Sequence, residues 1–322
     1  MLTVLLATRN RARILRDVLA SYCLVQQPSS GWKIVVVDNG STDETPTVIE
    51  SFKRRLPLHS VSEPKLGKNH ALNTGLGLVE GDLAVFTDDD AFPAPDWLVR
   101  LREAVDTQPA YSIFTGPVVP RWESPPPLWN QWVDQGPVFT LTSPTLNEGP
   151  IPSYLVYGPN MAVRASIFQS GTQFDPSIGP SGGNYAMGSE TELVARLGRQ
   201  GHEAWYVQGA VVEHFIRKGQ MKKAWVMQRA IRYGRGQYRL NYAEKDKSRK
   251  LLMGMPRYLL REIFEEGLLM TKACVSFRQE DFFRSRWRLN FVRGKAMEAR
   301  ILVRERRRLA QTRGIVSLPG TR

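Results

Sequence analysis

Residues 2–40 read LTVLLATRNRARILRDVLASYCLVQQPSSGWKIVVVDNG and carry the clearest sign of the fold class. The runs from Leu2 to Ala7 and from Ile34 to Val37 are apolar throughout and have strand length, as expected for parallel strands covered on both faces. Between them, apolar residues recur at helical spacing from Ile14 to Tyr22. Strand, amphipathic helix and strand in this order predict a βαβ unit.

The same alternation continues along the chain. A third apolar run, Leu83 to Phe86, follows a helical stripe from Ala71 to Val79. Eight prolines in residues 120–152 predict a long irregular loop or a few edge strands. The sequence then predicts a helix that begins at Gly188 and stops at Gly201, and a strand from Trp205 to Val212. We expect an α/β fold with a mostly parallel central sheet flanked by helices.

Charge is distributed unevenly over the 322 residues, whose formal net charge is +13. Residues 1–213 hold 16 Lys and Arg against 22 Asp and Glu, whereas residues 214–322 hold 28 against nine, a net charge of +19. The chain is thus an acidic body followed by a basic, helical region with an apolar stripe from Leu260 to Val275. The basic excess favours an anionic partner, but we expect no nucleic acid, because basic helices interleaved with base-stacking aromatics are missing from the pattern.

Composition also indicates the cellular compartment of the protein. Cys23 and Cys274 cannot build a disulfide framework, and their separation predicts two reduced thiols. The first residues, MLTVLLATRNR, lack the order of charges and the cleavage site of a secretory signal, and no apolar run reaches the ~18 residues that span a bilayer. These features predict a cytoplasmic protein.

Three carboxylates, Asp88, Asp89 and Asp90, follow the apolar run that ends at Phe86. Ligands of open α/β sheets bind outside the carboxyl ends of the strands, where these residues fall. Adjacent carboxylates repel one another, and a divalent cation that bridges to substrate phosphates is the usual remedy. The alternative is a helix N-cap cluster, although Asp96 is better placed for that cap.

A second polar cluster follows the strand that ends at Val37. Asp38 stands at the strand tip, where contact with a ligand and a purely structural role are both open; for Asp43 we favour a helix cap. The chain has no G-x-x-x-x-G-K-[ST] loop, and its Gly75-x-Gly77 pattern has neither the spacing nor the position of a dinucleotide fingerprint. A nucleotide here must be held in another way.

Several motifs in fixed order carry a resemblance to a known family. They read ATRNR (7–11), VDNGSTDET (37–45), GKNHALNTG (67–75), FTDDDAFPAPDWL (86–98), YGPNMAVR (157–164), FDPSIGPSGG (174–183) and GSETELVARL (188–197), with a histidine at position 214. Over roughly residues 1–235 this order resembles the family 2 glycosyltransferases of GT-A fold, the fold of nucleotide-diphospho-sugar transferases.

The resemblance implies roles for residues that match the family motifs. Thr8 and Arg9 match the segment against the nucleotide base, Asp38 matches the carboxylate that reads the base, and Lys68 lies in the segment near the base and diphosphate. Asp88 and Asp90 match the outer positions of the DxD motif. The donor would thus contact Thr8, Arg9, Asp38, Lys68, Asp88 and Asp89, and Asp90 with His214 would hold Mn²⁺ or Mg²⁺; since Asp89 is acidic too, the register can shift by one.

Glu190 occupies the position of the family's general base. The usual Gly-Glu-Asp-Thr-Glu-Leu context reads Gly-Ser-Glu-Thr-Glu-Leu here, so the carboxylate is kept on a side chain longer by one methylene. Without the family, Glu190 would be read as an acid at a helix N-terminus, and for Glu192 we favour a structural role. His214 is expected to follow a strand over 210–212 and to complete the metal site.

The implied activity is metal-dependent, inverting transfer of a sugar from a nucleotide-diphosphate sugar, UDP-sugar before GDP- or dTDP-sugar, to the hydroxyl of a sugar or a lipid-linked acceptor. We expect a GT-A catalytic domain over 1–220, with a nucleotide-binding half over about 1–110 and an acceptor half over about 111–220, followed by a basic helical region over 221–322. Three aromatic residues are expected to shape the acceptor site: Trp122, Trp129 and Trp132.

The sequence leaves two points open: whether the protein is catalytic, and what the basic helical region does. The chain could be a non-catalytic protein that binds a nucleotide sugar, a polyanion or a membrane on the same scaffold. The basic helical region could dock peripherally on an anionic membrane at its inner face, where a lipid-linked acceptor would be found, or it could be a solvated structural tail.

Overall fold

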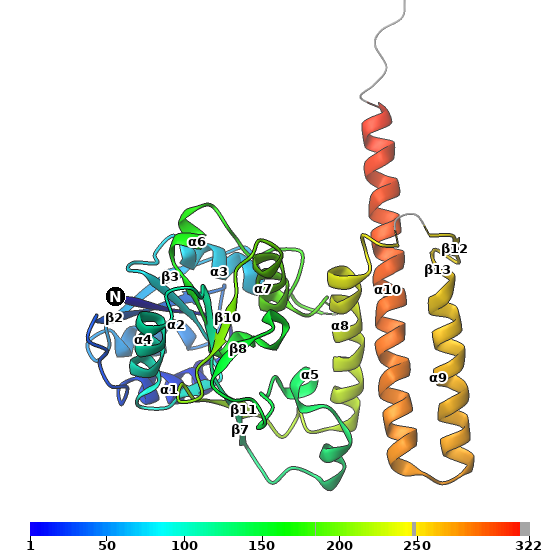
Figure 1. The fold of residues 1–322 in the computed structure, drawn as a ribbon, viewed down its shortest axis with the longest axis horizontal. Helices are drawn as coiled ribbons and strands as arrows, with labels where there is room; N and C mark the ends of the chain where they lie inside the picture. Colours follow the sequence, from blue (N-terminus) through cyan, green and yellow to red (C-terminus); the bar gives the residue numbers. More distant parts are fainter. Residues whose placement is uncertain (184, 247–248, 316–322) are drawn as a thin grey trace, which may run out of the picture. The chain divides into compact units, whose positions relative to one another are not determined.

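The computed structural model describes residues 1–183, 185–246 and 249–315, with side chains up to residue 311, and has the expected α/β architecture (Figure 1). The chain divides into two compact units. The first comprises residues 1–127, 134–183 and 188–221. The second comprises residues 128–133 and 185–187 and the described part of the chain beyond residue 221.

The first unit is built on an eight-stranded sheet with the order β3-β2-β1-β4-β9-β6-β10-β8. β1 is parallel to β2 and to β4, as the apolar runs predicted, whereas β9 is antiparallel to its neighbours β4 and β6. The strands are β1 (Leu2–Thr8), β2 (Trp32–Asp38), β3 (Leu58–Ser62), β4 (Leu83–Phe86), β6 (Ile113–Thr115), β8 (Gly149–Ile151), β9 (Met161–Arg164) and β10 (Ala204–Tyr206).

Helices cover both faces of this sheet (Figure 1). One face packs against α1 (Ala12–Tyr22), α2 (Thr45–Phe52) and α4 (Trp97–Thr107), and the other against α3 (Lys68–Leu76), α6 (Ser166–Gln169) and α7 (Ser189–Arg199). Successive residues of β2 alternate between the two cores, since Ile34 and Val36 join one and Val35 and Val37 the other. Burial on both faces explains why the strand is apolar throughout.

A smaller sheet in the same unit has the order β5-β11-β7, with β5 (Ala91–Pro93), β7 (Val118–Trp122) and β11 (Val212–Ile216). The prediction of one strand over Trp205–Val212 was wrong. The start of this segment belongs to β10 in the large sheet, and its end belongs to β11 in the smaller sheet. A turn separates them, in which the Ala210 N–H donates to the Val207 carbonyl. The chain thus crosses between sheets, and His214 lies inside β11 instead of following a strand.

The proline-rich stretch contains the two edge strands β7 and β8, as expected, and also a short helix that the sequence did not predict. This helix, α5 (Gln135–Phe139), is capped by the Asp134 carboxylate, which accepts from the Gly136 N–H. Two short 3₁₀ turns follow, η2 (Ser153–Leu155) and η3 (Gly158–Asn160). Asn160 is fully buried and binds the Pro117 and Ala210 carbonyls, which fixes η3 against the turn that leads to β11.

The second unit is mainly helical, as the basic region predicted. Its elements are η1 (Leu128–Trp132), α8 (Lys223–Asn241), the short pair β12 (Leu251–Leu252) and β13 (Met255–Pro256), α9 (Arg257–Val275) and α10 (Gln279–Ile315). A Cβ atom on Gly234 or Gly294 would collide with the backbone of the facing helix, so α8 and α10 cross closely. Buried Glu298 on α10 pairs with Arg235 and Arg239 of α8. None of the described helices is long and apolar enough to cross a membrane.

Candidate active site

The carboxyl ends of neighbouring strands bring several of the predicted residues to one edge of the large sheet. Thr8 ends β1 and lies opposite Asp38, the last residue of β2, in the parallel register. Asp88, Asp89 and Asp90 follow β4, the other neighbour of β1. The order of strands therefore gathers polar residues from three segments of the chain at the edge where α/β sheets bind ligands.

Lys68 lies between two of the predicted carboxylates. It begins α3, directly after Gly67, whose φ of 137° is open to glycine but strained for other residues. The Lys68 ammonium is hydrogen-bonded to the Asp88 carboxylate and lies 2.6 Å from Glu190 Oε1. Burial alone would lower the pKa of Lys68, but the charges of Asp88 and Glu190 outweigh it and raise the pKa well above its usual value.

Glu190 lies in the first turn of α7, close to the YGPN segment. The helix begins after Gly188, which has a φ of 115°. A Cβ atom at Gly158, the first residue of η3, would lie 2.5 Å from Glu190 Cδ, so only glycine leaves room for this side chain. The two family-like motifs GSETEL and YGPN therefore meet at Glu190. This contact fixes the carboxylate beside Lys68.

Asp89 turns toward β1. Thr8 Oγ1 donates to Asp89 Oδ2 at 2.7 Å, and the Arg11 guanidinium lies 4.0 Å from the same oxygen. Burial and the negative charge of Asp90 raise the pKa of Asp89 to about 7. Asp89 thus accepts a proton more readily than an ordinary aspartate does.

Asp90 and His214 form the third contact of the site. His214 Nε2 lies 3.4 Å from Asp90 Oδ1, because β11 pairs with β5 in a register that places His214 opposite Ala91. His214 Nδ1 donates to the Phe139 carbonyl at 2.7 Å, which fixes the tautomer and points Nε2 at Asp90.

This pair shifts the pKa of each partner. Burial would raise the pKa of Asp90, but the hydrogen bond and charge of His214 lower it below its usual value. Burial would lower the pKa of His214, but Asp90 raises it. The two side chains therefore stabilise each other in their charged forms.

The Asp90 and His214 pair fits a divalent cation. It offers a carboxylate oxygen and an imidazole nitrogen that point at each other, and the second ring nitrogen is anchored on a carbonyl, as in many metal-ligating histidines. Within the described residues no group of three or more His, Cys, Asp or Glu side chains is placed to hold a metal. A cation here would need further ligands from a bound diphosphate or water.

The other predicted contacts occupy positions with different local roles. Asp38 accepts from the backbone N–H and the hydroxyl of Ser41, which closes the turn after β2. Asp43 accepts from the N–H of Thr45 and of Ala12, the first residues of α2 and α1, so it satisfies one free N–H at the start of each helix. The N-cap positions themselves are Glu44 and Arg11. Arg9 is exposed beyond the end of β1. Within the described residues, the Arg9 side chain forms no ion pair with Asp88, Asp89 or Asp90.

Arg11 is a site residue that sequence reasoning missed. Its guanidinium lies 4.0 Å from both Asp89 Oδ2 and Asp90 Oδ2, and it also lines a cavity of about 400 Å³ together with Arg217. The chain reaches this position because Asn10 adopts a left-handed φ of 52°, after which α1 begins. The only signal in the sequence is a second arginine in ATRNR, next to an asparagine that tolerates this backbone conformation.

Two further expectations have structural outcomes. Glu192 pairs with Arg196 one turn later on α7, in agreement with its expected structural role. Trp129 and Trp132 pack against Phe283 within the second unit, and Trp122 packs against Phe139 in the first. These three rings are used in packing, and nothing in their contacts marks them as a sugar platform.

Chemically, this edge of the sheet combines cations with a paired carboxylate and imidazole. Lys68 and Arg11 can neutralise an anionic ligand, Asp90 and His214 can hold a cation, and Glu190 can accept a proton once Lys68 is engaged elsewhere. Such a site suits a phosphate-bearing ligand and a proton transfer.

Sequence comparisons agree with this geometry. Residues 3–171 match the model of the family described as glycosyl transferase family 2. The succinoglycan biosynthesis protein ExoM of Rhizobium meliloti is 27% identical over 237 residues, which cover 72% of each chain. A glucosyl-dolichyl phosphate glucuronosyltransferase of Haloferax volcanii is 24% identical over 212 residues, which cover 63% of this chain and 65% of the other.

Solved structures share the fold. The mannosyltransferase PcManGT from Pyrobaculum calidifontis, in complex with GDP-Man and Mn²⁺, superposes with a TM-score of 0.59 at 19% identity and covers 92% of this chain and 86% of its own. TarS 1–349 from S. aureus, in complex with UDP-GlcNAc, has a TM-score of 0.56 at 12% identity and covers 91% and 90%. With its family match over more than half of the chain and its GT-A architecture, this protein is a member of glycosyl transferase family 2.

Proposed function

We propose that the protein transfers a sugar from a nucleotide-diphosphate sugar to an acceptor hydroxyl with inversion at the anomeric carbon. The observation that supports this most directly is the contact of Lys68 with both Asp88 and Glu190. It joins a residue of the donor segment, a residue of the DxD motif and the candidate base in one cluster.

In this proposal Glu190 is the general base. Its carboxylate takes the proton of the acceptor hydroxyl, whose oxygen forms a bond to the anomeric carbon. The bond from that carbon to the diphosphate oxygen breaks on the opposite face, and the nucleoside diphosphate leaves. One displacement inverts the configuration.

Two cationic side chains, Lys68 and Arg11, would bind the diphosphate. Lys68 exchanges part of its pairing with Asp88 and Glu190 for phosphate oxygens, and this frees Glu190 to act as a base. Arg11, at 4.0 Å from Asp89 and Asp90, offers a second positive charge beside the cluster. Arg9 and Asp38 stand at the ends of β1 and β2, where they would contact the nucleoside, while Thr8 orients Asp89.

Asp90 and His214 would hold a divalent cation, which would supply Lewis-acid stabilisation for the leaving diphosphate. An imidazole ligand favours Mn²⁺ over Mg²⁺, which prefers oxygen. The anchoring of His214 on the Phe139 carbonyl keeps its Nε2 directed at the site.

The donor is proposed as a UDP- or GDP-sugar, with UDP-sugar first, and the acceptor as a sugar or lipid-linked hydroxyl. A solved structural neighbour binds UDP-GlcNAc and another binds GDP-Man with Mn²⁺, so both nucleotides suit this fold. The domain boundaries proposed from the sequence, 1–220 and 221–322, would leave every residue of the proposed site in the first domain.

A donor screen tests the proposal. Thermal denaturation is followed with each UDP-, GDP- and dTDP-sugar, with and without Mn²⁺, because a ligand that binds the folded state raises the melting temperature. We expect one donor to stabilise the protein only when Mn²⁺ is present, and to release nucleoside diphosphate on incubation. Absence of both stabilisation and release across the screen would contradict the assignment.

A further inference from the structure

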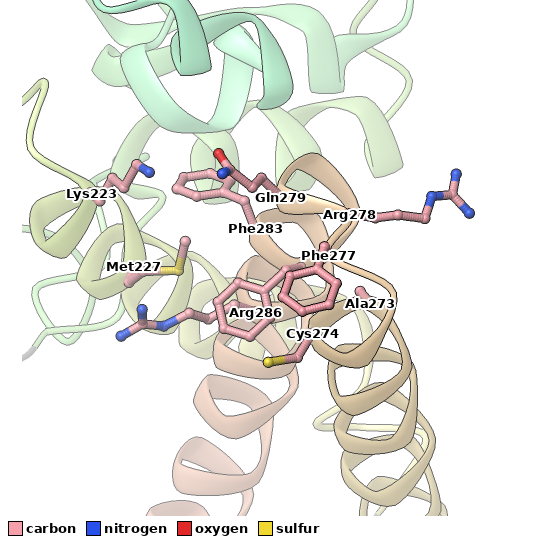
Figure 2. A pocket seen from close by; sticks show the side chains of 10 residues that line it. Lys223, Met227, Ala273, Cys274, Phe277, Arg278, Gln279, Phe283 and Arg286 are labelled. Carbon is pink, nitrogen blue, oxygen red and sulfur yellow. The ribbon is translucent and has the colours of Figure 1, made fainter.

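The end of the second unit where α9 turns into α10 carries two neighbouring hollows. The first has a volume of about 330 Å³, with walls that include Met227, Phe277 and Phe283 (Figure 2). Lys223, Arg278 and Arg286 line the same hollow, and in Figure 2 the Arg278 side chain extends away from the apolar residues. An apolar interior bordered by cations suits a ligand that has both apolar and anionic parts.

The second hollow, also of about 330 Å³, shares Ala273 and Arg278 with the first. It adds three cations, Lys272, Arg284 and Arg288, and one carboxylate, Asp281. Asp281 pairs with Arg278, and Glu280 pairs with Arg284, but cations still outnumber carboxylates around the two hollows. The net charge of this surface is therefore positive, and it complements an anionic partner.

Exposed apolar side chains occur on α9 and at the turn, where Phe277 also lines the first hollow. Phe277, at the turn, is 92% exposed, and Val275, Phe264 and Leu268 of α9 are 73%, 72% and 62% exposed. The three α9 residues are spaced by four and seven positions, close to whole helical turns, so they share one face of the helix. Single exposed apolar residues are ordinary, but a stripe of them that ends in an aromatic tip is not.

The end of α9 explains the backbone of Phe277. Its φ of 55° lies in the left-handed region, and it follows Ser276, the C-cap of α9. The Phe277 N–H donates to the Cys274 carbonyl and the Arg278 N–H to the Ala273 carbonyl, which is the usual Schellman end of a helix. This end of the helix places the Phe277 ring at the turn, where it is exposed to solvent.

We propose that this surface, made of α9 from Phe264 onward, the turn at Phe277 and the start of α10 up to Arg288, docks on an anionic phospholipid bilayer. Phe277 and the α9 stripe enter the apolar boundary of the bilayer, and the cations around the two hollows bind lipid phosphates. The juxtaposition of an apolar tip and a net positive charge selects a lipid surface over a soluble anion, which would leave the apolar residues in water.

Vesicle sedimentation with the full-length protein tests this. We expect binding to vesicles of phosphatidylglycerol and phosphatidylcholine in equal parts, weaker binding as salt rises, and little binding to phosphatidylcholine alone. Arg286→Gln and Arg288→Gln should each weaken binding about fivefold, since each cation near an anionic surface contributes about that factor. Phe264→Ser with Phe277→Ser should weaken it at least as much. Equal binding to both kinds of vesicle would contradict the proposal.

Matched control variants come from the first unit. Leu24 is 71% exposed, and Arg54 and Arg199 are exposed cations. Leu24→Ser, Arg54→Gln and Arg199→Gln should leave vesicle binding unchanged, and if they weaken it as strongly as the variants of the proposed surface, the docking site is wrong. Release of nucleoside diphosphate with a soluble acceptor should stay normal in all variants, which separates a failure of docking from a failure of catalysis.

A fluorophore attached to Cys274 detects contact between this surface and a bilayer, and it leaves the apolar stripe unchanged. Cys274 is an exposed, free thiol in the wall of the first hollow, and Cys23→Ser leaves it as the single labelling site. A polarity-sensitive fluorophore at Cys274 should shift to shorter wavelength with anionic vesicles and not with inorganic phosphate. A shift with phosphate alone would point to a soluble-anion site and overturn the bilayer assignment, as would the lack of any shift with vesicles.

Discussion

Lys68 Nζ lies 2.6 Å from Glu190 Oε1 and makes a second hydrogen bond to Asp88, so one ammonium group joins the candidate base to the acidic cluster that follows β4. Without a donor this pairing neutralises two carboxylates that would otherwise face each other. In the proposed function, a donor diphosphate would compete for the same ammonium, and availability of the base would depend on occupation of the donor site.

Lys68→Met should impair donor binding and the fold together. Removal of one partner of a largely buried ion pair leaves carboxylates unpaired and costs about 3–5 kcal/mol of stability. We expect a lower melting temperature and a weaker affinity for the donor, measured by titration calorimetry. Lys68→Arg keeps the charge and serves as the control. If Lys68→Met bound donor as tightly as the wild type, Lys68 would have no part in the donor site.

Metal affinity should depend on pH through His214. Its pKa is raised, so below that pKa the ring is protonated on Nε2 and a proton competes with the cation. Affinity for Mn²⁺ should therefore increase as pH rises through and beyond the ordinary pKa of histidine, about 6.5. Electron paramagnetic resonance of free Mn²⁺ measures this.

His214→Ala should weaken Mn²⁺ binding on the order of tenfold or more and abolish its dependence on pH in this range. The matched control is His202→Ala, because His202 lies away from the acidic cluster and contacts Ser112. A His214→Ala protein with an unchanged affinity for Mn²⁺ would remove His214 from the proposed metal site.

Asp89 should make the protein less stable near neutral pH. Its pKa is about 7 in the folded state and lower when unfolded, so the folded state binds the extra proton and stability falls as pH rises from about 4 to about 7. Asp89→Asn keeps an acceptor for Thr8 and removes the charge. We expect a melting temperature higher by about 2–4 °C near pH 8, which is roughly 1 kcal/mol, and little change near pH 4. If Asp89→Asn raised the melting temperature more near pH 4 than near pH 8, the predicted pH dependence would be wrong.

Gly158→Ala should displace the base. The added Cβ would lie 2.5 Å from Glu190 Cδ, so the carboxylate or the YGPN turn must move. A shift of about 1 Å can cost on the order of 10²-fold in rate. We expect a lower kcat with near-normal donor affinity. Gly219→Ala is the control, since a Cβ there meets no atom within 4 Å. Equal turnover in both variants would show that the position of Glu190 is unimportant.

Parallel strands were the most predictable part of the fold. Because β1, β2 and β4 are covered on both faces, their apolar character is continuous and easily seen. The same property misled the prediction over Trp205–Val212. Both β10 and β11 are largely buried, so the run did not show that the chain changes sheets at the turn around Gly209.

The candidate site was predictable where a motif ends a strand or begins a helix. Asp88 was predicted in that way, whereas the roles of Glu190 and His214 were predicted from the family resemblance, and His214 lies inside β11. The sequence could not show that Lys68 bridges Asp88 and Glu190, because that contact depends on how α3 and α7 pack on the same face of the sheet. It also did not reveal Arg11, whose direction is set by the left-handed backbone of Asn10.

The measurement that tests the central claim most directly is single-turnover transfer by Glu190→Gln beside its donor affinity. Glutamine keeps the shape of the side chain but cannot take the acceptor proton, so the rate of transfer should fall by about 10²–10⁴-fold. Donor affinity should be unchanged or tighter, because Lys68 is released from one carboxylate. A variant that transfers sugar at a near-normal rate, or that loses its rate only because the donor no longer binds, would contradict Glu190 as the general base.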